Sequence, residues 1–180
     1  MDTAEILSFD LKIGFPGDIA SCNPYYPAIA RGVGIRADEK GLTVGRFVWL
    51  KDDAFVGSSS GWAGQSVSHT PKATEAPLGI VMRRLDSTML TLSDDQLPMI
   101  PAGDAVTIAR AGDIFVITET IAMAGQAVFA QPGTGAIITS APDQMPADVI
   151  ATCFTVAQGG QAGEVIVISA IGHSREGSMQ

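Results

Sequence analysis

The chain offers few side chains for nucleophilic chemistry. It has two histidines, His69 and His173, and a hydrolase would need one of them held beside a nucleophile such as Ser58–Ser60 or Cys22. His69 stands in a segment rich in glycine and serine, and His173 stands near the C-terminus. The sequence therefore predicts a solvated loop residue at each place. A hydrolase is the weaker interpretation, and we expect no catalytic residue.

Metal and phosphate sites also lack the required spacing. Two histidines without clustered cysteines form no zinc pattern, and Cys22 and Cys153 lie far apart, as is typical of two reduced thiols. The glycines at 57, 61 and 64 lack the Lys-Ser/Thr pair that completes a phosphate-binding loop. We expect neither a metal nor a cofactor.

The carboxylates include two adjacent pairs, Asp52-Asp53 and Asp94-Asp95. Adjacent residues of a strand point to opposite faces of a sheet, so neither pair can converge on a glycosidic bond or a calcium ion. Both pairs are predicted to be solvated strand ends.

Composition indicates an acidic chain with little charge on its surface. Of the 180 residues, 17% are charged and 46% are hydrophobic, and 11 basic against 19 acidic residues give a net charge of −8. That sign repels nucleic-acid phosphates and anionic lipid heads, so we expect neither as a direct partner. The N-terminal residues lack a signal-peptide pattern, and no apolar run reaches the roughly 18–20 residues of a membrane span. We expect synthesis in a cytoplasm, and a low charge fraction because much of the surface is interface.

Alternating apolar and polar residues predict strands along most of the chain, and these strands would have to position any functional site. The predicted strands cover residues 45–50, 90–92, 106–109, 113–121, 147–156 and 164–168. The last of these is apolar on both faces, which is typical of a central or interface strand. No window has helical spacing. We predict an all-β fold, a small β-barrel or β-sandwich of many short strands with an extended N-terminal arm.

A short motif, Ala-Gly-x-x-Val, occurs at residues 102–106 and again at 124–128, with a looser copy at 44–48. We expect its glycine to adopt a positive φ that sets the start and register of the following strand. The motif suits a small barrel and implies no activity.

Three parts of the chain are distinguished by composition. Residues 1–27 are predicted to be the arm, because proline and glycine interrupt them and their apolar residues need a cover. Residues 28–171 are predicted to be the barrel or sandwich, with a long Gly/Ser loop at 57–70. Residues 172–180 are predicted to be a flexible tail. The apolar residues of the arm are Ile6, Leu7, Phe9, Leu11, Ile13 and Phe15.

Eight residues, large and apolar, aromatic or basic, are predicted to contact a partner. Aromatic side chains contribute most of the energy at interfaces, and a basic doublet in an acidic chain suits an acidic partner surface. Two alternatives stay open: Trp62 as a lid on its own domain, and the doublet as part of a local ion pair. The eight residues are Ile13, Phe15, Pro16, Tyr25, Tyr26, Trp62, Arg83 and Arg84.

The run Gly14-Phe15-Pro16-Gly17-Asp18-Ile19-Ala20 resembles the structural cement (decoration) proteins of tailed-bacteriophage capsids. The resemblance covers most of residues 14–170, whereas residues 1–13 and the loop at 57–70 have no counterpart. Its further motifs follow in order at residues 42–48, 78–81, 102–108, 112–116 and 124–129.

This resemblance implies a non-enzymatic protein on the exterior of the virion capsid, made in the host cytoplasm. Its partners would be the major capsid protein, whose neighbouring copies it bridges, and further copies of itself in a homo-dimer or homo-trimer. Several weak contacts per oligomer would give tight binding through avidity. The alternative function is a ligand- or glycan-binding β module on a virion or cell surface, with Trp62 and Tyr25-Tyr26 as stacking platforms.

Overall fold

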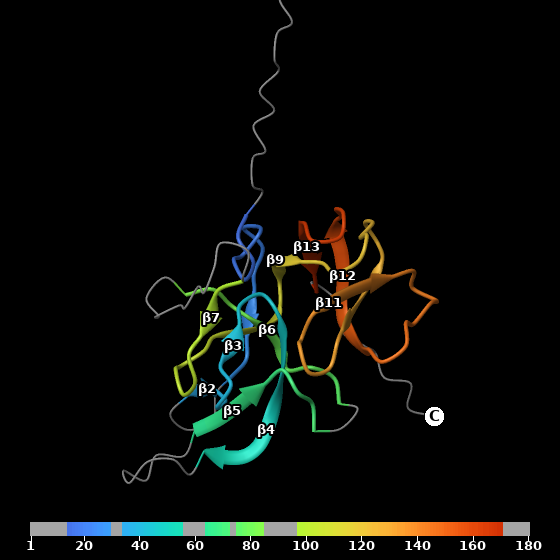
Figure 1. Ribbon diagram of the computed structural model, residues 1–180. Coiled ribbons are helices and arrows are strands. Elements are labelled where there is room, and N and C mark those ends of the chain that lie inside the picture. The colour runs from blue at the N-terminus through green and yellow to red at the C-terminus, as the bar shows by residue number, and fades with distance from the viewer. Residues whose placement is uncertain (1–13, 30–33, 56–63, 73–74, 85–96, 171–180) are drawn as a thin grey trace, which may run out of the picture.

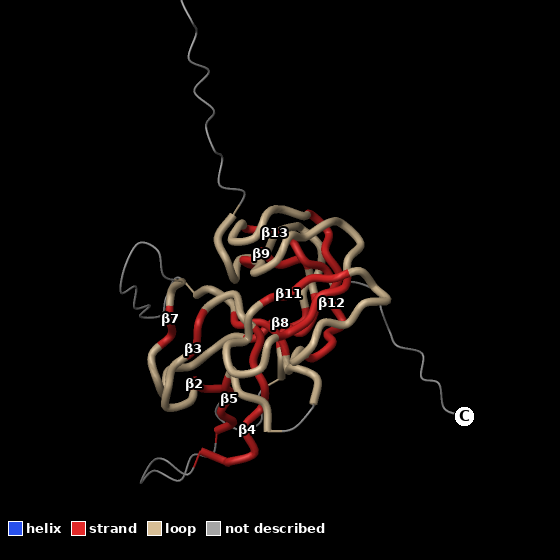
Figure 2. The backbone as a smooth tube through the Cα atoms, turned by 45° about the vertical axis from the view of Figure 1, so that its right-hand side comes forward, coloured by secondary structure: helices blue, strands red, loops and turns tan. Residues whose placement is uncertain are grey.

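The computed structural model of the protein describes residues 14–29, 34–55, 64–72, 75–84 and 97–170. In these residues it has thirteen strands in three sheets and no helix, which confirms the predicted all-β fold (Figures 1 and 2). Nothing in this part of the chain offers a helix that is long and apolar enough to cross a membrane.

The largest sheet has six strands. Their order is β1 (Tyr26–Pro27), β8 (Ile108–Ala111), β6 (Gly79–Val81), β4 (Phe47–Phe55), β5 (Gly64–Ser68) and β2 (Ile35–Ala37). Neighbouring strands are antiparallel except β2 and β5, which are parallel.

The second sheet has five antiparallel strands, and a small third sheet pairs two more. The five-stranded order is β11 (Ile137–Ser140), β10 (Ala127–Ala130), β12 (Ile150–Gln158), β13 (Val165–Ser169) and β9 (Asp113–Ile117). The small sheet joins β3 (Leu42–Thr43) to β7 (Met99–Ile100). The chain passes from β8 into β9 through Gly112, whose φ of 127° allows the change of direction from one sheet to the next.

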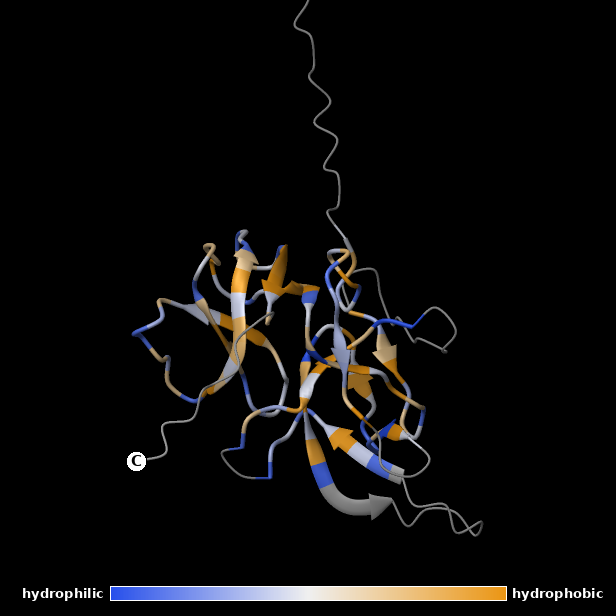
Figure 3. Cartoon of the chain, turned by 180° about the vertical axis from the view of Figure 1, so that it is seen from behind, coloured by the Kyte–Doolittle hydropathy of each residue, from blue (hydrophilic) through white to orange (hydrophobic). Residues whose placement is uncertain are grey.

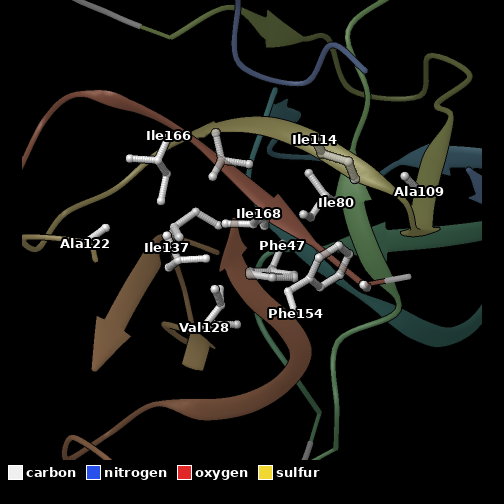
Figure 4. Close-up of a cluster of buried hydrophobic side chains, with 14 of the residues drawn as sticks. Phe47, Ile80, Ala109, Ile114, Ala122, Val128, Ile137, Phe154, Ile166 and Ile168 are labelled. Atoms are coloured by element: carbon white, nitrogen blue, oxygen red, sulfur yellow. The ribbon is translucent and has the colours of Figure 1, made fainter. Parts of the chain in front are cut away.

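The middle of the six-stranded sheet, at Phe47–Trp49 of β4 and at β6, is buried on both faces because its side chains alternate between two cores. Phe47 and Ile80 point into a core shared with the five-stranded sheet, whereas the next residues, Val48 and Val81, point into a core covered by β3 and β7. The ring of Phe47 meets that of Phe154 edge-on, with centroids 5.8 Å apart (Figure 4). The hydrophobic residues in Figure 3 accordingly concentrate on strands, and the hydrophilic ones on turns.

Several local predictions are confirmed. Along β12 the buried residues are Ile150, Phe154 and Val156, all on the predicted side, and β13 lies between β12 and β9 as a central strand should. The three glycines of the repeated motif have positive φ, 76° at Gly45, 79° at Gly103 and 86° at Gly125.

The described strands form no closed barrel; one β-bridge, between Thr118 and Ile137, joins the two ends of the five-stranded sheet. Two local predictions need correction. The strand at 45–50 does not end at Lys51-Asp52-Asp53 but continues to Phe55, because β5 supplies partners for its backbone. Residues 64–68 of the expected loop at 57–70 form β5, paired with β4 on one side and β2 on the other.

Candidate functional site

The N-terminal segment lies along the outer edge of the five-stranded sheet. Gly17 N–H donates to the carbonyl of Phe115 at 2.8 Å, and Phe115 N–H donates to the backbone carbonyl of Asp18 at 3.0 Å. Ala20 N–H donates to the backbone carbonyl of Asp113 at 2.8 Å. Ile19 forms a bridge with Ile114 in β9. Residues 14–20 are therefore held in place by the backbone of β9, although they form no named strand.

The carboxylate of Asp113 holds residues 21–23 on β9 through hydrogen bonds from two side chains. Ser21 Oγ donates to its Oδ2 at 2.6 Å and Asn23 Nδ2 donates to the same oxygen at 2.8 Å. Burial raises the pKa of Asp113, but hydrogen bonds from Ser21, Ser169 and Asn23 outweigh it and hold the pKa below its ordinary value. The carboxylate is thus charged at neutral pH and fixes residues 21–23 on β9.

The segment exposes a series of large apolar side chains, which we call the N-terminal face. These residues share a proline-punctuated stretch in which only Tyr26 and Pro27 belong to a strand, so the sheets do not bury them. The members, with their exposed fractions, are Phe15 (53%), Ile19 (39%), Tyr25 (41%), Tyr26 (61%) and Ile29 (89%).

Arg83 reinforces this face. Its Nη1 lies 3.1 Å from Asp18 Oδ2, and its guanidinium carbon lies 4.6 Å from the centroid of the Phe15 ring. The backbone N–H of Arg83 also donates to Gly17 at 2.9 Å. Arg83 therefore takes part in a local ion pair and at the same time supports an exposed aromatic ring.

The structure brings four of the eight predicted contact residues together, Phe15, Tyr25, Arg83 and Arg84. A shallow hollow of about 500 Å³ is lined by Asp18, Ile19, Tyr25, Arg83 and Arg84, among others. Phe15 reaches this group through its contact with Arg83, and Pro16 packs against Gly45. Tyr26 lies in β1 and does not line the hollow. Ile13 and Trp62 lie outside the described residues. Ile19 and Ile29 are exposed but were not predicted as contact residues; the available signal was their place in a stretch with prolines at 16, 24 and 27, where few residues belong to a strand.

His69 is not the solvated loop residue that the sequence predicts. Its Nδ1 lies 2.8 Å from the carbonyl of Phe47, and Thr43 N–H donates to its Nε2 at 2.9 Å. Burial is the largest effect and lowers the pKa of His69; the hydrogen bond to Phe47 raises the pKa in part, Arg46 lowers it, and Asp38 raises it least, so the pKa lies below its ordinary value. Backbone groups occupy both ring nitrogens, so His69 is not poised as a general base.

The other candidates for chemistry do not assemble into a site. Cys22 and Cys153 are exposed and are not joined in a disulfide. Within the described ranges no three or more His, Cys, Asp or Glu side chains gather in a metal-binding group. Ser58–Ser60, Asp94-Asp95 and His173 lie outside those ranges.

Comparison with known proteins gives a match over nearly the whole chain. The family described as "Structural cement protein (E217 gp24/Pam3 gp6)" matches residues 6–171. Among solved structures, the chain is similar to one from "The capsid of Myoviridae Phage XM1", with a TM-score of 0.55 and 14% identity over 94% of this chain and 98% of that chain. A head fiber gp8.5 N base of bacteriophage phi29 gives a TM-score of 0.45 and 11% identity over 82% of this chain and 100% of that one. No curated protein matches the chain.

Proposed function

Because the chain belongs to the structural cement protein family of bacteriophages, we propose that it binds the outer surface of an assembled capsid and bridges neighbouring copies of the major capsid protein. The role is structural rather than enzymatic. The likeness to a chain of the XM1 capsid concerns the fold alone and agrees with this assignment.

The observation that supports the proposal most is the N-terminal face. Five large apolar side chains are exposed within residues 15–29, and an arginine is already positioned beside them by Asp18 and Phe15. Tyrosine and arginine are enriched among the residues that dominate binding energy. The entropy lost when the N-terminal segment binds is reduced because hydrogen bonds to β9 and Asp113 already hold this segment in the free protein. We propose that this face contacts the capsid, with Phe15, Pro16, Tyr25, Tyr26, Arg83 and Arg84 as contact residues.

Ile13 and Trp62 belong to the same proposal through their sequence positions alone. For the residues before Gly14 we keep the proposal that they are an arm whose apolar side chains bind an apolar surface of the capsid. Residues 14–24 carry the bonds to β9 and Asp113, so a truncation that spares the fold must stop before Gly14. Deleting residues 2–13 is expected to weaken capsid binding without changing the unfolding midpoint.

Bridging requires more than one contact per particle of cement protein. We propose that the chain forms a homo-dimer or homo-trimer, so that several weak contacts combine through avidity. The net charge of −8 keeps free subunits apart from nucleic acid and anionic membranes before they bind. Sedimentation equilibrium of the full chain tests this step, and a monomer at all concentrations would contradict it.

Co-sedimentation with undecorated capsids tests the proposed face. Tyr26→Ala removes an exposed aromatic ring and should weaken binding about 30-fold, the loss typical of an interface residue worth about 2 kcal/mol. Met145→Ala is the matched control, because Met145 is equally exposed, at 61%, in the turn between β11 and β12. Equal affinities for the two variants would exclude the N-terminal face as the contact.

A second candidate function, binding of a glycan or small ligand, is favoured by one feature, the exposed rings of Tyr25 and Tyr26. Sugar rings stack on such surfaces. If this function applies, the protein binds a glycan on an array and Tyr26→Ala abolishes that binding. If it does not apply, the array shows no binding.

A further inference from the structure

His69 is hydrogen-bonded to strands of two sheets and to a turn of the third. Its imidazole accepts from the N–H of Thr43 in β3 at 2.9 Å and contacts the carbonyl of Phe47 in β4 at 2.8 Å. Its own carbonyl accepts from the N–H of Gly133, in the turn between β10 and β11, at 2.9 Å. Within the described chain, one residue thus links the small sheet, the six-stranded sheet and the five-stranded sheet.

The partners determine where the ring carries its proton. Thr43 offers an N–H, so Nε2 must be the acceptor, and the proton sits on Nδ1, which donates to the Phe47 carbonyl. The neutral ring in this tautomer satisfies both contacts. A second proton on Nε2 would face the N–H of Thr43, placing two donors opposite each other and leaving the Thr43 amide without an acceptor.

The turn between β10 and β11 packs directly on this contact. Phe47 N–H donates to the carbonyl of Gly135 at 2.8 Å, so both backbone groups of Phe47 belong to the same cluster. Gly135 has a φ of 66°, and a side chain there would overlap the Phe47 carbonyl and the ring of His69. A shift of the ring is therefore transmitted to the turn rather than absorbed by empty space.

We propose that His69 is a pH-sensitive clasp between the three sheets, closed while the ring is neutral and opened at Thr43 when Nε2 takes up a proton. The charged groups that act on the ring are Arg46, which opposes protonation, and Asp38, which favours it. The turn at 131–136 contributes no titratable side chain. Burial is the largest effect on the ring and, together with Arg46, outweighs the Phe47 hydrogen bond and Asp38, so the pKa of His69 lies below the ordinary 6.5. The clasp is a property of the free subunit and does not depend on the capsid.

Nuclear magnetic resonance on the ¹⁵N-labelled full chain tests the clasp. At neutral pH the His69 ring is expected to be protonated at Nδ1 alone. As pH falls from about 7.5 to about 4.5, the protection factor of the Thr43 amide against hydrogen exchange should drop about five- to tenfold, as expected for the loss of one hydrogen bond. The drop should follow the titration of His69, with a midpoint below 6.5.

Two variants separate this effect from general acid destabilisation. His69→Gln cannot titrate and should lose the pH-dependent change at Thr43, whereas His173→Gln removes the other histidine and should keep it. A His69 ring protonated at Nε2 at neutral pH would overturn the proposal. So would a Thr43 protection factor that stays constant while His69 titrates. Both readouts use the unmodified chain, so they decide the matter even if His69→Gln fails to fold.

Discussion

Replacing Asp113 with asparagine should loosen the N-terminal segment from β9. Asparagine keeps a side-chain oxygen near Ser21 and Asn23 but removes the charge. Hydrogen bonds to a charged acceptor contribute about 1.5–3 kcal/mol and neutral ones about 1 kcal/mol. The two bonds from Ser21 and Asn23 would thus lose about 0.5–2 kcal/mol each, or about 1–4 kcal/mol together, and relief of the burial penalty returns part of that. We expect a net loss of about 1–2 kcal/mol in the free energy of unfolding.

Urea unfolding at neutral pH measures this loss, with Asp143→Asn in an exposed turn as the matched control. The control should change stability by less than about 0.5 kcal/mol. A double-mutant cycle with Ser21→Ala should give a coupling of about 1 kcal/mol, because the two side chains share one hydrogen bond. If the stability losses of Asp113→Asn and Ser21→Ala simply add in the double variant, Asp113 does not hold the N-terminal segment through Ser21.

The same variant has a defined pH signature. The folded pKa of Asp113 lies below the ordinary 3.8, so its contribution is complete above that value and is lost as pH falls through the lower folded pKa. The stability difference between the wild type and Asp113→Asn should therefore be constant near neutral pH and shrink below about pH 4. A difference that grows on acidification would contradict the assigned cause.

Three further predictions follow from packing and exposure. Phe154→Ala removes the ring that meets Phe47 edge-on and should cost about 3–5 kcal/mol in urea unfolding; a loss below about 1 kcal/mol would show that this core is not shared by the two sheets. Gly17→Ala should lower the thermal midpoint more than Gly103→Ala, because both have positive φ but only Gly17 lacks room for a side chain; equal shifts would argue against the close contact. Ellman's reagent should titrate two thiols in the native protein, and a slow second thiol would contradict the exposure of both cysteines.

Strands that are specified by their own side chains were predictable. In β12 the buried residues Ile150, Phe154 and Val156 all lie on one side of the strand, and in β13 the side chains of Val165 to Ile168 are apolar on both faces and are buried or half-buried. The strand β5 was not predictable, because its sequence, Gly-Gln-Ser-Val-Ser, has one buried apolar residue. Its pairing with β4 and β2 comes from distant segments, which local patterns do not reveal.

The same distinction applies to the candidate site. Phe15, Tyr25 and Tyr26 were identified from residue type and neighbouring prolines, which are local properties. The contact of Arg83 with Asp18 joins residues 65 positions apart, and the bonds of His69 to Thr43 and Phe47 span 26 and 22 positions. Only the folded chain shows that Arg83, paired with Asp18, lies beside the ring of Phe15. Only the folded chain shows that the His69 ring joins β3 to β4.

A cryo-electron microscopy map of capsids incubated with the purified protein shows whether the chain binds the capsid exterior and which face it uses. Ordered density is expected on the outer surface at regular lattice positions, with residues 14–29 and Arg83 turned toward the major capsid protein. Capsids without added density, or density that presents the N-terminal face to solvent, would contradict this expectation.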